Sequence, residues 1–582
     1  MTDPTPPRRR LPRWLWLVGA LLVLIPVGLL AALMAALSPR VESGSVLEIR
    51  LEGALAEVQP DNPLAALMGG GGRSVSLAGL RRIADAMADD SKVAGVLLEI
   101  GPLQSGFASV DEAREAIARI RAAKKPVYAV LVGDFVEEKD YLLATAADRI
   151  ILSPEAGTLL NGFVAESMFL RGTLDKLRIE PQFFHFKEYK GAAEPFMNKT
   201  MSQPLREELT ALLEGYYQHF VTVVAERRGL GADELKALFD RGGLTAHEAL
   251  EAKLVDELGY AQDAEASLRK AAHADQGKPR RVTAGAFLTA YEPSTRGDAI
   301  GVVYGTGAIT SSSGGSPFGG EGIHGPSMAA AIREAAEDDA VKAIILRVNS
   351  PGGSAVGSDL VWRAVKEARE KKPVVVSMGD VAASGGYWIS MGADAIVAQP
   401  TTVTGSIGVV GGKFNVRGLI DSAGANVETV KVGANADLMS PFRTFDETQA
   451  ERWKSWMTAV YDDFVTRAAE GRHMKPEVLE PLAHGRIWTG LDAKERHLVD
   501  EIGGFTRAVE LAREKAKIPQ GAPTHLVRFP PPRGLLAALR EGEFPGVKIL
   551  AGEESLSQAL EATLTELETF QPWALAPTLR IH

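Results

Sequence analysis

One half of this sequence is an imperfect copy of the other half. The segment LVDELG at 254–259 returns as LVDEIG at 498–503, 244 residues later. Three more segments, KKPVYAVLVGD (124–134), AADRIILSP (146–154) and VAGVLLEI (93–100), return in the same order at offsets near 246. A preserved order at a nearly constant offset indicates a tandem duplication. The chain is therefore expected to build one domain architecture twice.

The duplication divides the 582 residues into segments, since a chain of this length is too long for one hydrophobic core. The expected segments are a basic tail at 1–13, an apolar segment at 14–37, a first repeat at 45–270, a linker at 271–297, a second repeat at 298–517 and a C-terminal extension at 518–582. The linker is polar and interrupted by Gly and Pro. In the extension, EESLSQALEATLTELETF is expected to form one amphipathic helix that packs or mediates assembly.

Within each repeat, short apolar runs alternate with amphipathic stretches. AGVLLEI, PVYAVLV and RIILS have the length and composition of buried strands, and SVDEAREAIARIRAA has the periodicity of a helix. This alternation predicts an α/β fold with a largely parallel sheet in each repeat. The glycine-rich segments MGGGGR (68–73) and SSSGGSPFGGEG (311–322) are interpreted as surface loops, with a substrate-gating flap as the alternative.

The segment WLWLVGALLVLIPVGLLAALMAAL, at 14–37, contains 24 residues and no charge. A helix of that length spans ~36 Å, and the apolar core of a bilayer is about 30 Å thick. We expect a transmembrane signal anchor; a cleaved signal peptide, the alternative, has a shorter apolar core. The segment is preceded by four arginines, Arg8, Arg9, Arg10 and Arg13, which should remain in the cytoplasm. The residues after the segment are therefore expected on the other side of the membrane.

Composition excludes several functions. The net charge of −10 argues against nucleic acid as a partner, because phosphate binding needs a concentrated basic face. The absence of cysteine excludes disulfides and thiol nucleophiles, and no histidine has the spacing of a metal site or a catalytic triad. TGSIGVVGGK does not match a phosphate-binding loop, because Lys413 is followed by Phe414 instead of Ser or Thr. No cofactor or metal is implied.

The stretch GDVAASGGYWIS places Ser384 where a strand ending at Met378 is expected to turn into a helix that begins near the serine. The alternative for such a serine is an ordinary helix N-cap. NSPGGS, at 349–354, follows the preceding strand, and its glycines would let backbone N–H groups approach a ligand, as an oxyanion hole requires. The N–H of Gly385 could be a second donor, whereas a simple Pro-Gly turn is the alternative for NSPGGS.

The two repeats differ at these positions. At the offset of 246, Ser384 corresponds to Glu138, so the first repeat lacks the serine and its glycines. A serine nucleophile needs a base, and a buried lysine with a lowered pKa can serve as one. Spacing alone cannot select that lysine among the 64 lysines and arginines of the chain.

The motifs GDVAASGGYWIS, NSPGGS, TGSIGVVGG and HGRIWTGLDAKERHLVDEIGG resemble those of the bacterial signal peptide peptidase family, also called protease IV, in its long membrane-anchored form. The resemblance extends from the apolar segment to about Gly504. It implies that Ser384 is the nucleophile, that Lys190 in EYKGAAEPF is the general base and that Ser406 orients the lysine. It also implies a crotonase/Clp-protease type of fold in each repeat and a homotetramer.

From these features we expect a serine endopeptidase, anchored by 14–37 in the inner membrane, with its catalytic part on the periplasmic side. Its substrates would be apolar peptides, particularly cleaved signal peptides. Gly353 and Gly385 would stabilise the oxyanion, and one site would form across the repeats because the second repeat has Ala436 where the first has Lys190. Activity should rise from acid toward neutral or mildly alkaline pH. The alternatives are an inactive membrane-anchored scaffold and a crotonase-like acyl-CoA enzyme.

Overall fold

The computed structural model describes residues 41–59, 74–274, 280–291, 293–312, 322–531 and 573–575. The expected membrane anchor at 14–37, the glycine-rich segment at 68–73, most of the one at 311–322 and the amphipathic helix expected at 553–570 lie outside these residues. Within the described ranges, none of the helices combines the length and the apolar character that a membrane crossing requires.

The first repeat is built on a parallel sheet with the strand order β10-β1-β2-β3-β5-β9. Its strands are β1 (Ser45–Gly53), β2 (Val93–Leu103), β3 (Val127–Leu131), β5 (Arg149–Leu152), β9 (Glu257–Leu258) and β10 (Arg281–Thr283). One face packs against helices α3 (Leu77–Met87), α4 (Phe107–Ala122), α5 (Glu138–Ala144) and α8 (Gln203–Arg228), and the other against α11 (Ala261–Ala271). The apolar runs read from the sequence are these buried strands.

The second repeat has the same plan, with the strand order β22-β11-β14-β16-β17-β21. Its strands are β11 (Asp298–Thr306), β14 (Val341–Ser350), β16 (Val374–Ala383), β17 (Ala395–Ala398), β21 (Glu501–Ile502) and β22 (Thr524–Phe529). Helices α13 (Gly325–Glu337), α14 (Ala355–Arg369), α15 (Gly385–Ser390) and α17 (Glu447–Gly471) cover one face, and α20 (Phe505–Lys515) covers the other. The duplication expected from the sequence is present as two α/β units of the same topology.

Polar contacts that stabilise the fold occur in both repeats, at offsets close to the 246 residues expected from the sequence. The hydroxyl groups of Tyr141 and Tyr387 donate to the carbonyl oxygens of Leu254 and Leu498, at 2.6 and 3.0 Å. In the same way, the carboxylates of Asp148 and Asp394 accept the N–H groups of Val127 and Val374, which begin β3 and β16. These paired contacts explain why the two halves of the sequence still resemble each other away from the serine motif.

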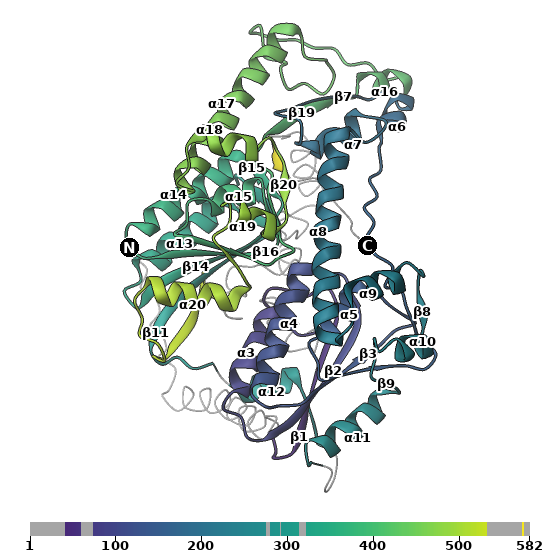
Figure 1. The fold of residues 1–582 in the computed structure, drawn as a ribbon. Coiled ribbons are helices and arrows are strands. Elements are labelled where there is room, and N and C mark those ends of the chain that lie inside the picture. The colour runs from purple at the N-terminus through teal and green to yellow at the C-terminus, as the bar shows by residue number, and fades with distance from the viewer. Residues whose placement is uncertain are drawn as a thin grey trace, which may run out of the picture.

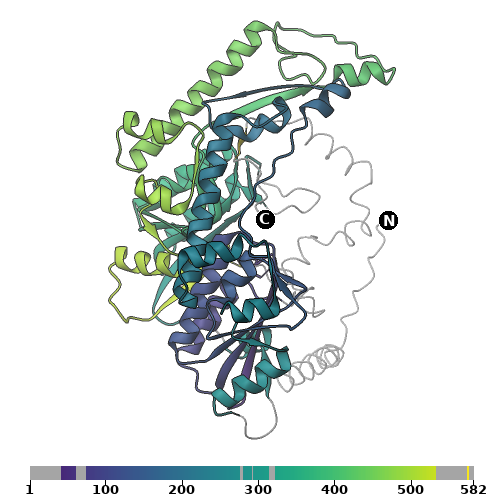
Figure 2. The ribbon, with the colours of Figure 1, turned by 45° about the vertical axis from the view of Figure 1, so that its right-hand side comes forward.

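A further sheet joins the two repeats, and its order is β13-β12-β15-β23-β19-β7. Strand β7 (Glu180–His185) belongs to the first repeat and pairs antiparallel with β19 (Val410–Asn415) of the second. The other members are β12 (Ala308–Thr310), β13 (Gly322–His324), β15 (Gly352–Ser354) and β23 (Trp573–Leu575). Figures 1 and 2 show the first repeat below the second, with α8 running from one toward the other and the β7–β19 pair at the far end of the second repeat.

The remaining elements are short. In the first half they are β4 (Phe135–Val136), β6 (Gly157–Thr158), α6 (Arg171–Lys176), η1 (Gly191–Ala193), α7 (Glu194–Met197), α9 (Ala232–Phe239), β8 (Leu244–Thr245), α10 (Ala246–Glu251) and α12 (Ala284–Ala290). In the second half they are β18 (Val403–Gly405), α16 (Arg417–Ser422), α18 (Pro476–Leu479), η2 (Glu480–Leu482), β20 (Ile487–Trp488) and α19 (Gly490–Glu495). Strand β18 pairs with the last three residues of β16, and β20 pairs with β18.

Candidate active site

Ser384 lies at the turn between β16 and α15, as the sequence predicts, but the strand is longer than expected. It continues past Met378 to Ala383, because residues 381–383 pair with β18. Ser384 is fully buried, and its backbone has φ 57° and ψ −115°, a conformation that L-residues rarely adopt. Its side chain makes no N-cap hydrogen bond to α15. The ordinary N-cap interpretation is therefore wrong, and the hydroxyl is available for another partner.

That partner is Lys190, which follows β7 at the start of η1. The Nζ atom of Lys190 donates to the Oγ of Ser384 at 2.7 Å, to the carbonyl oxygen of Ser406 at 2.9 Å and to the Oγ of Ser406 at 3.0 Å. A Cβ atom on Gly485 would lie 2.6 Å from the Cβ of Lys190, so only glycine fits there. The structure thus brings together three residues that the resemblance singled out, within one chain and from both repeats.

Burial determines the charge state of this lysine. Lys190 is 1% exposed, and burial lowers its pKa to about 7, with the nearby charge of Glu208 acting in the opposite direction. A lysine in water has a pKa of about 10.4 and is almost fully protonated at pH 7. Because the pKa of Lys190 is lowered to about 7, a substantial fraction of its amine is neutral near that pH. A neutral amine beside a serine hydroxyl can accept the hydroxyl proton.

Glu208, on α8, is a second buried ionisable group beside the site, and no sequence motif marks it. Its Oε2 accepts the N–H of Ile487 at 2.8 Å, and its Oε1 has no hydrogen-bond partner in the described part of the chain. Burial raises the pKa of Glu208 to about 8, while Lys190 and Arg486 act to lower it. Ile487 adjoins Arg486, whose carbonyl oxygen accepts the N–H of Ser406 at 2.7 Å.

The glycines expected to form an oxyanion hole lie next to each other. A Cβ atom on Gly385 would lie 3.0 Å from the backbone nitrogen of Gly353 and 2.6 Å from the Oγ of Ser358. Gly353 has φ 152°, and a Cβ atom on it would lie 2.2 Å from the carbonyl oxygen of Ile309. Both positions therefore need glycine.

An extended segment of the chain lies against the same glycines. The backbone of β23 pairs antiparallel with β15, with Ala574 opposite Gly353, and β23 also pairs with β19. The side of β15 that β23 occupies can therefore form main-chain hydrogen bonds with an extended segment. This feature lies far from the serine motif in the sequence and was not anticipated.

The corresponding position of the first repeat is occupied by a carboxylate. Glu138 is 5% exposed, and its Oε1 accepts the N–H groups of Asn161 and Gly162, at 2.8 and 3.0 Å. This pairing with backbone donors explains how a carboxylate is accommodated where the second repeat has Ser384.

Within the described residues, no group of three or more His, Asp or Glu side chains is arranged to hold a metal ion.

Comparison with known proteins yields a family and several relatives. The profile of "Peptidase family S49" matches residues 119–275 and 366–519. "Serine protease SPPA, chloroplastic" from Arabidopsis thaliana is 32% identical over 534 residues, which cover 90% of this chain and 77% of that protein. "Protease 4" from Salmonella typhi is 35% identical over 451 residues, 74% of this chain and 71% of that protein. "Putative signal peptide peptidase SppA" from Enterococcus faecium is 37% identical over 188 residues, 32% of this chain and 55% of that protein.

Proposed function

Because this chain belongs to peptidase family S49 and is a serine protease of that family, we propose that Ser384 and Lys190 form its catalytic dyad. The observation that carries this proposal is the 2.7 Å hydrogen bond between the Nζ of Lys190 and the Oγ of Ser384. The lowered pKa of Lys190 supports it, since a base must be uncharged to accept a proton. Membership in a peptidase family argues against the acyl-CoA alternative.

The reaction starts with the neutral amine of Lys190 accepting the proton of Ser384 as the Oγ atom attacks the substrate carbonyl carbon. The backbone N–H groups of Gly353 and Gly385 stabilise the negative charge on the carbonyl oxygen. The C–N bond then breaks, and the Lys190 ammonium protonates the leaving amine. Water, deprotonated by Lys190, attacks the acyl group and releases Ser384. The amine of Lys190 donates to the carbonyl oxygen and the Oγ of Ser406, and these two hydrogen bonds orient it toward Ser384.

The substrates in this proposal are extended apolar peptides, including cleaved signal peptides. The antiparallel pairing of β23 with β15 supports an extended conformation, because it is the arrangement that a bound peptide backbone would adopt. Apolar peptides from the membrane are reachable if residues 14–37 anchor the chain in the inner membrane with the catalytic part outside the cytoplasm. A homotetramer, implied by the resemblance, belongs to the same proposal and is testable by light scattering of the detergent-solubilised full chain.

The test of the dyad is hydrolysis of a fluorogenic apolar peptide by the full chain, comparing Ser384→Ala and Lys190→Ala with two matched controls. Lys413→Met removes another buried lysine, which donates to the carbonyl oxygen of Leu438, and Ser390→Ala removes another buried serine. We expect turnover to fall at least about 10³-fold in the two dyad variants and to stay within about threefold of wild type in the controls.

Two results would contradict the dyad. Full activity of Lys190→Ala in a folded protein would require a different base. An inactive wild-type protein that is folded and anchored would favour the scaffold interpretation.

The membrane anchor is tested separately, by extraction of membranes with alkaline carbonate. We expect the full chain to stay in the membrane fraction and a variant with Leu22→Arg and Leu29→Arg to be released, because charges at the centre of an apolar helix oppose insertion. Release of the wild-type chain would contradict the anchor.

A further inference from the structure

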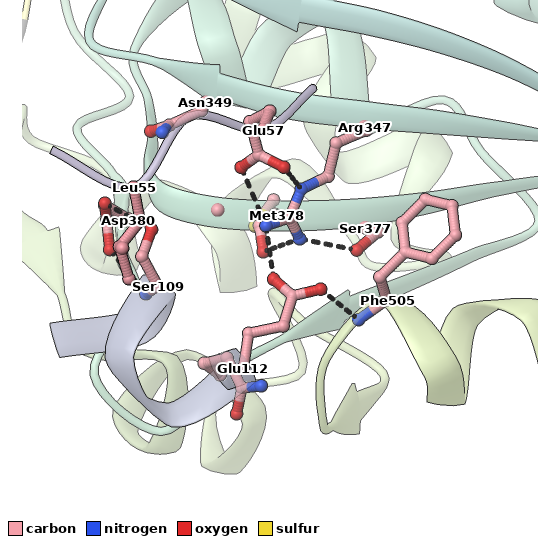
Figure 3. Close-up of polar contacts among 12 residues, drawn as sticks. Leu55, Glu57, Ser109, Glu112, Arg347, Asn349, Ser377, Met378, Asp380 and Phe505 are labelled. Carbon is pink, nitrogen blue, oxygen red and sulfur yellow. Dashed lines mark hydrogen bonds and ion pairs between the residues drawn. The ribbon is translucent and has the colours of Figure 1, made fainter. Parts of the chain in front are cut away.

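The strand that leads into Ser384 is bound to the first repeat through Asp380 (Figure 3). The Oδ1 of Asp380 accepts the N–H of Ser109 at 2.7 Å, and its Oδ2 accepts the Oγ–H of Ser109 at 2.7 Å and the N–H of Gly106 at 3.1 Å. Gly106 is the N-cap of α4, and the helix has no side-chain cap of its own. Asp380 therefore caps a helix of the other repeat, with its negative charge at the helix N-terminus.

The contact leaves no space for adjustment. A Cβ atom on Gly106 would lie 2.5 Å from the Cγ of Asp380, so the close approach depends on a glycine at the start of α4. The three hydrogen bonds use both carboxylate oxygens, which fixes the orientation of Asp380 as well as its distance from α4.

A second connection holds β16 a short distance upstream. Arg347, on the adjacent strand β14, donates from one guanidinium nitrogen to the Oγ of Ser377 and the carbonyl oxygen of Met378, at 2.9 and 3.0 Å. Its other nitrogens pair with the carboxylates of Glu57 and Glu112 from the first repeat, as Figure 3 shows. All three charged side chains are buried. The first repeat thus contacts β16 directly through Asp380 and indirectly through Arg347.

The position of Ser384 depends on this part of β16. Between Asp380 and Ser384, the N–H of Val381 donates to the Oδ1 of Asn349 at 3.1 Å, and the N–H of Ser384 donates to the carbonyl oxygen of Gly405 at 2.8 Å. The serine itself has the unfavourable φ of 57°, which persists only where the surroundings hold it. Lys190 comes from the first repeat, so the distance between its Nζ and the Oγ of Ser384 depends on the position of β16 relative to the first repeat.

We propose that Asp380 is a positioning residue for catalysis, which holds the strand carrying the nucleophile in register with the repeat that supplies the base. This role rests on the function proposed above for Ser384 and Lys190. It assigns the first repeat a second contribution to the site, through the N-terminus of α4, in addition to the lysine. Asp380 does not contact the reacting atoms.

Asp394, which directly precedes β17, provides a matched control that contacts the same strand. Its Oδ2 accepts the N–H of Val374 at 2.8 Å, at the opposite end of β16 from Ser384, and its Oδ1 accepts from Arg369 at 3.0 Å. Both partners belong to the second repeat. Asp394 therefore stabilises β16 without connecting it to the first repeat or to the end that carries the serine.

The experiment compares Asp380→Asn and Asp394→Asn in the full chain, measuring kcat and KM on a fluorogenic apolar peptide, together with the melting temperature. We expect Asp380→Asn to lower kcat about 10-fold to 30-fold with KM within about twofold, because a misplaced nucleophile slows acylation without weakening peptide binding. Asp394→Asn should lower the melting temperature by a comparable amount and keep kcat within about twofold. Asp380→Glu, which keeps the charge, should be closer to wild type than Asp380→Asn.

The proposal is overturned if Asp380→Asn has the wild-type kcat, or if both variants lower kcat in proportion to their loss of thermal stability. If Asp380→Asn does not fold, Ser109→Ala is tested in its place, because it removes one of the three hydrogen bonds to Asp380. A lower kcat at unchanged KM in this variant supports the proposal, and an unchanged kcat overturns it. Ser384→Ala, measured in parallel, separates the two hypotheses. Its residual turnover would contradict the catalytic assignment, whereas an inactive Ser384→Ala beside a fully active Asp380→Asn would contradict only the positioning role.

Discussion

At the scale of single residues, the site contains two buried groups whose pKa values move toward each other. Burial disfavours the charged form of each, so the pKa of Lys190 falls to about 7 and that of Glu208 rises to about 8. Between these values, the neutral amine and the protonated carboxyl group coexist. An uncharged Lys190 is therefore available near neutral pH.

The pH dependence follows from the sign of the lysine shift. Lys190, the proposed base, is protonated below its pKa of about 7 and would be unable to accept a proton there; it becomes neutral as the pH rises through that value. We expect kcat/KM to fall about tenfold for each pH unit below 6. Near pH 7 it should reach at least half of the maximum that it has when Lys190 is fully neutral. The measurement is a pH–rate profile with an apolar peptide, and a profile that is flat down to pH 5 would contradict a lysine base.

Glu208 should affect the rate only where it ionises, above about pH 8. In the proposed mechanism its carboxylate would then stabilise the ammonium that forms on Lys190 during acylation, since opposite charges in a buried site attract strongly. Glu208→Gln keeps an oxygen for the N–H of Ile487 but cannot ionise. We expect the pH–rate profiles of wild type and Glu208→Gln to coincide at pH 6–7 and to separate above pH 8, with the variant about threefold to tenfold slower at pH 9. Profiles that coincide up to pH 9.5 would exclude this role.

At the scale of secondary structure, the pairing of β7 with β19 brings the lysine of one repeat to the serine of the other. The six residues of β7 face the six of β19 in antiparallel register, and η1 begins shortly after β7 ends. Gly412 makes the close pairing possible: a Cβ atom there would lie 2.1 Å from the carbonyl oxygen of Gln182. Such an approach is impossible for any other residue without a shift of the backbone.

Gly412→Val should therefore displace β7 and, with it, Lys190. We expect kcat to fall more than about 10-fold, because a displacement of about 1 Å at a catalytic group is enough for a large loss. Gly172→Ala is the control, since Gly172 lies in α6 with nothing within 4 Å of an added Cβ. The two variants are compared by turnover of the apolar peptide; a Gly412→Val protein as active as Gly172→Ala would show that β7 does not determine the position of the lysine.

At the scale of the whole molecule, buried charges join the two repeats. Arg347 is 1% exposed and pairs with Glu57 and Glu112, while Arg81 pairs with Glu112 and lies over the ring of Phe505. The pKa of Glu112 is lowered, because the attraction of Arg347 and Arg81 and the N–H of Phe505 together exceed the effect of burial. This arrangement favours one orientation of the repeats, since any other would leave a charge buried without a partner.

Arg347→Met should destabilise the protein strongly, by about 3–5 kcal/mol in the free energy of unfolding, because Glu57 and Glu112 would remain buried without their partner. Arg363→Met removes an exposed ion pair with Glu367 on one face of α14 and should have a much smaller effect. Urea titration followed by tryptophan fluorescence measures both. Equal effects of the two substitutions would mean that the buried network does not hold the repeats together.

Much of the fold could be predicted because it depends on local pattern. Buried strands and amphipathic helices have different periodicities. The segments that recur at offsets near 246 residues locate both repeats without comparison to another protein. The end of β16 was misjudged because residues 381–383 are held by pairing with β18, a contact that the local sequence does not contain. Glu208 and Asp380 were missed for the same reason: their partners, Ile487 and the start of α4, belong to the other repeat.

The duplication, the α/β class and the location of the serine motif can be read from the sequence, because the strand and helix patterns and the segments repeated between the halves are properties of short stretches of residues. How Lys190, the lysine implied by the resemblance, comes to lie beside Ser384 follows from the tertiary structure alone. Lys190 lies 194 positions before the serine, and its amine reaches the hydroxyl through the β7–β19 pairing and the packing of Gly485. The burial that lowers its pKa likewise arises from contacts between segments distant in the chain. Such contacts follow from how the whole molecule packs, and no local pattern of residues encodes them.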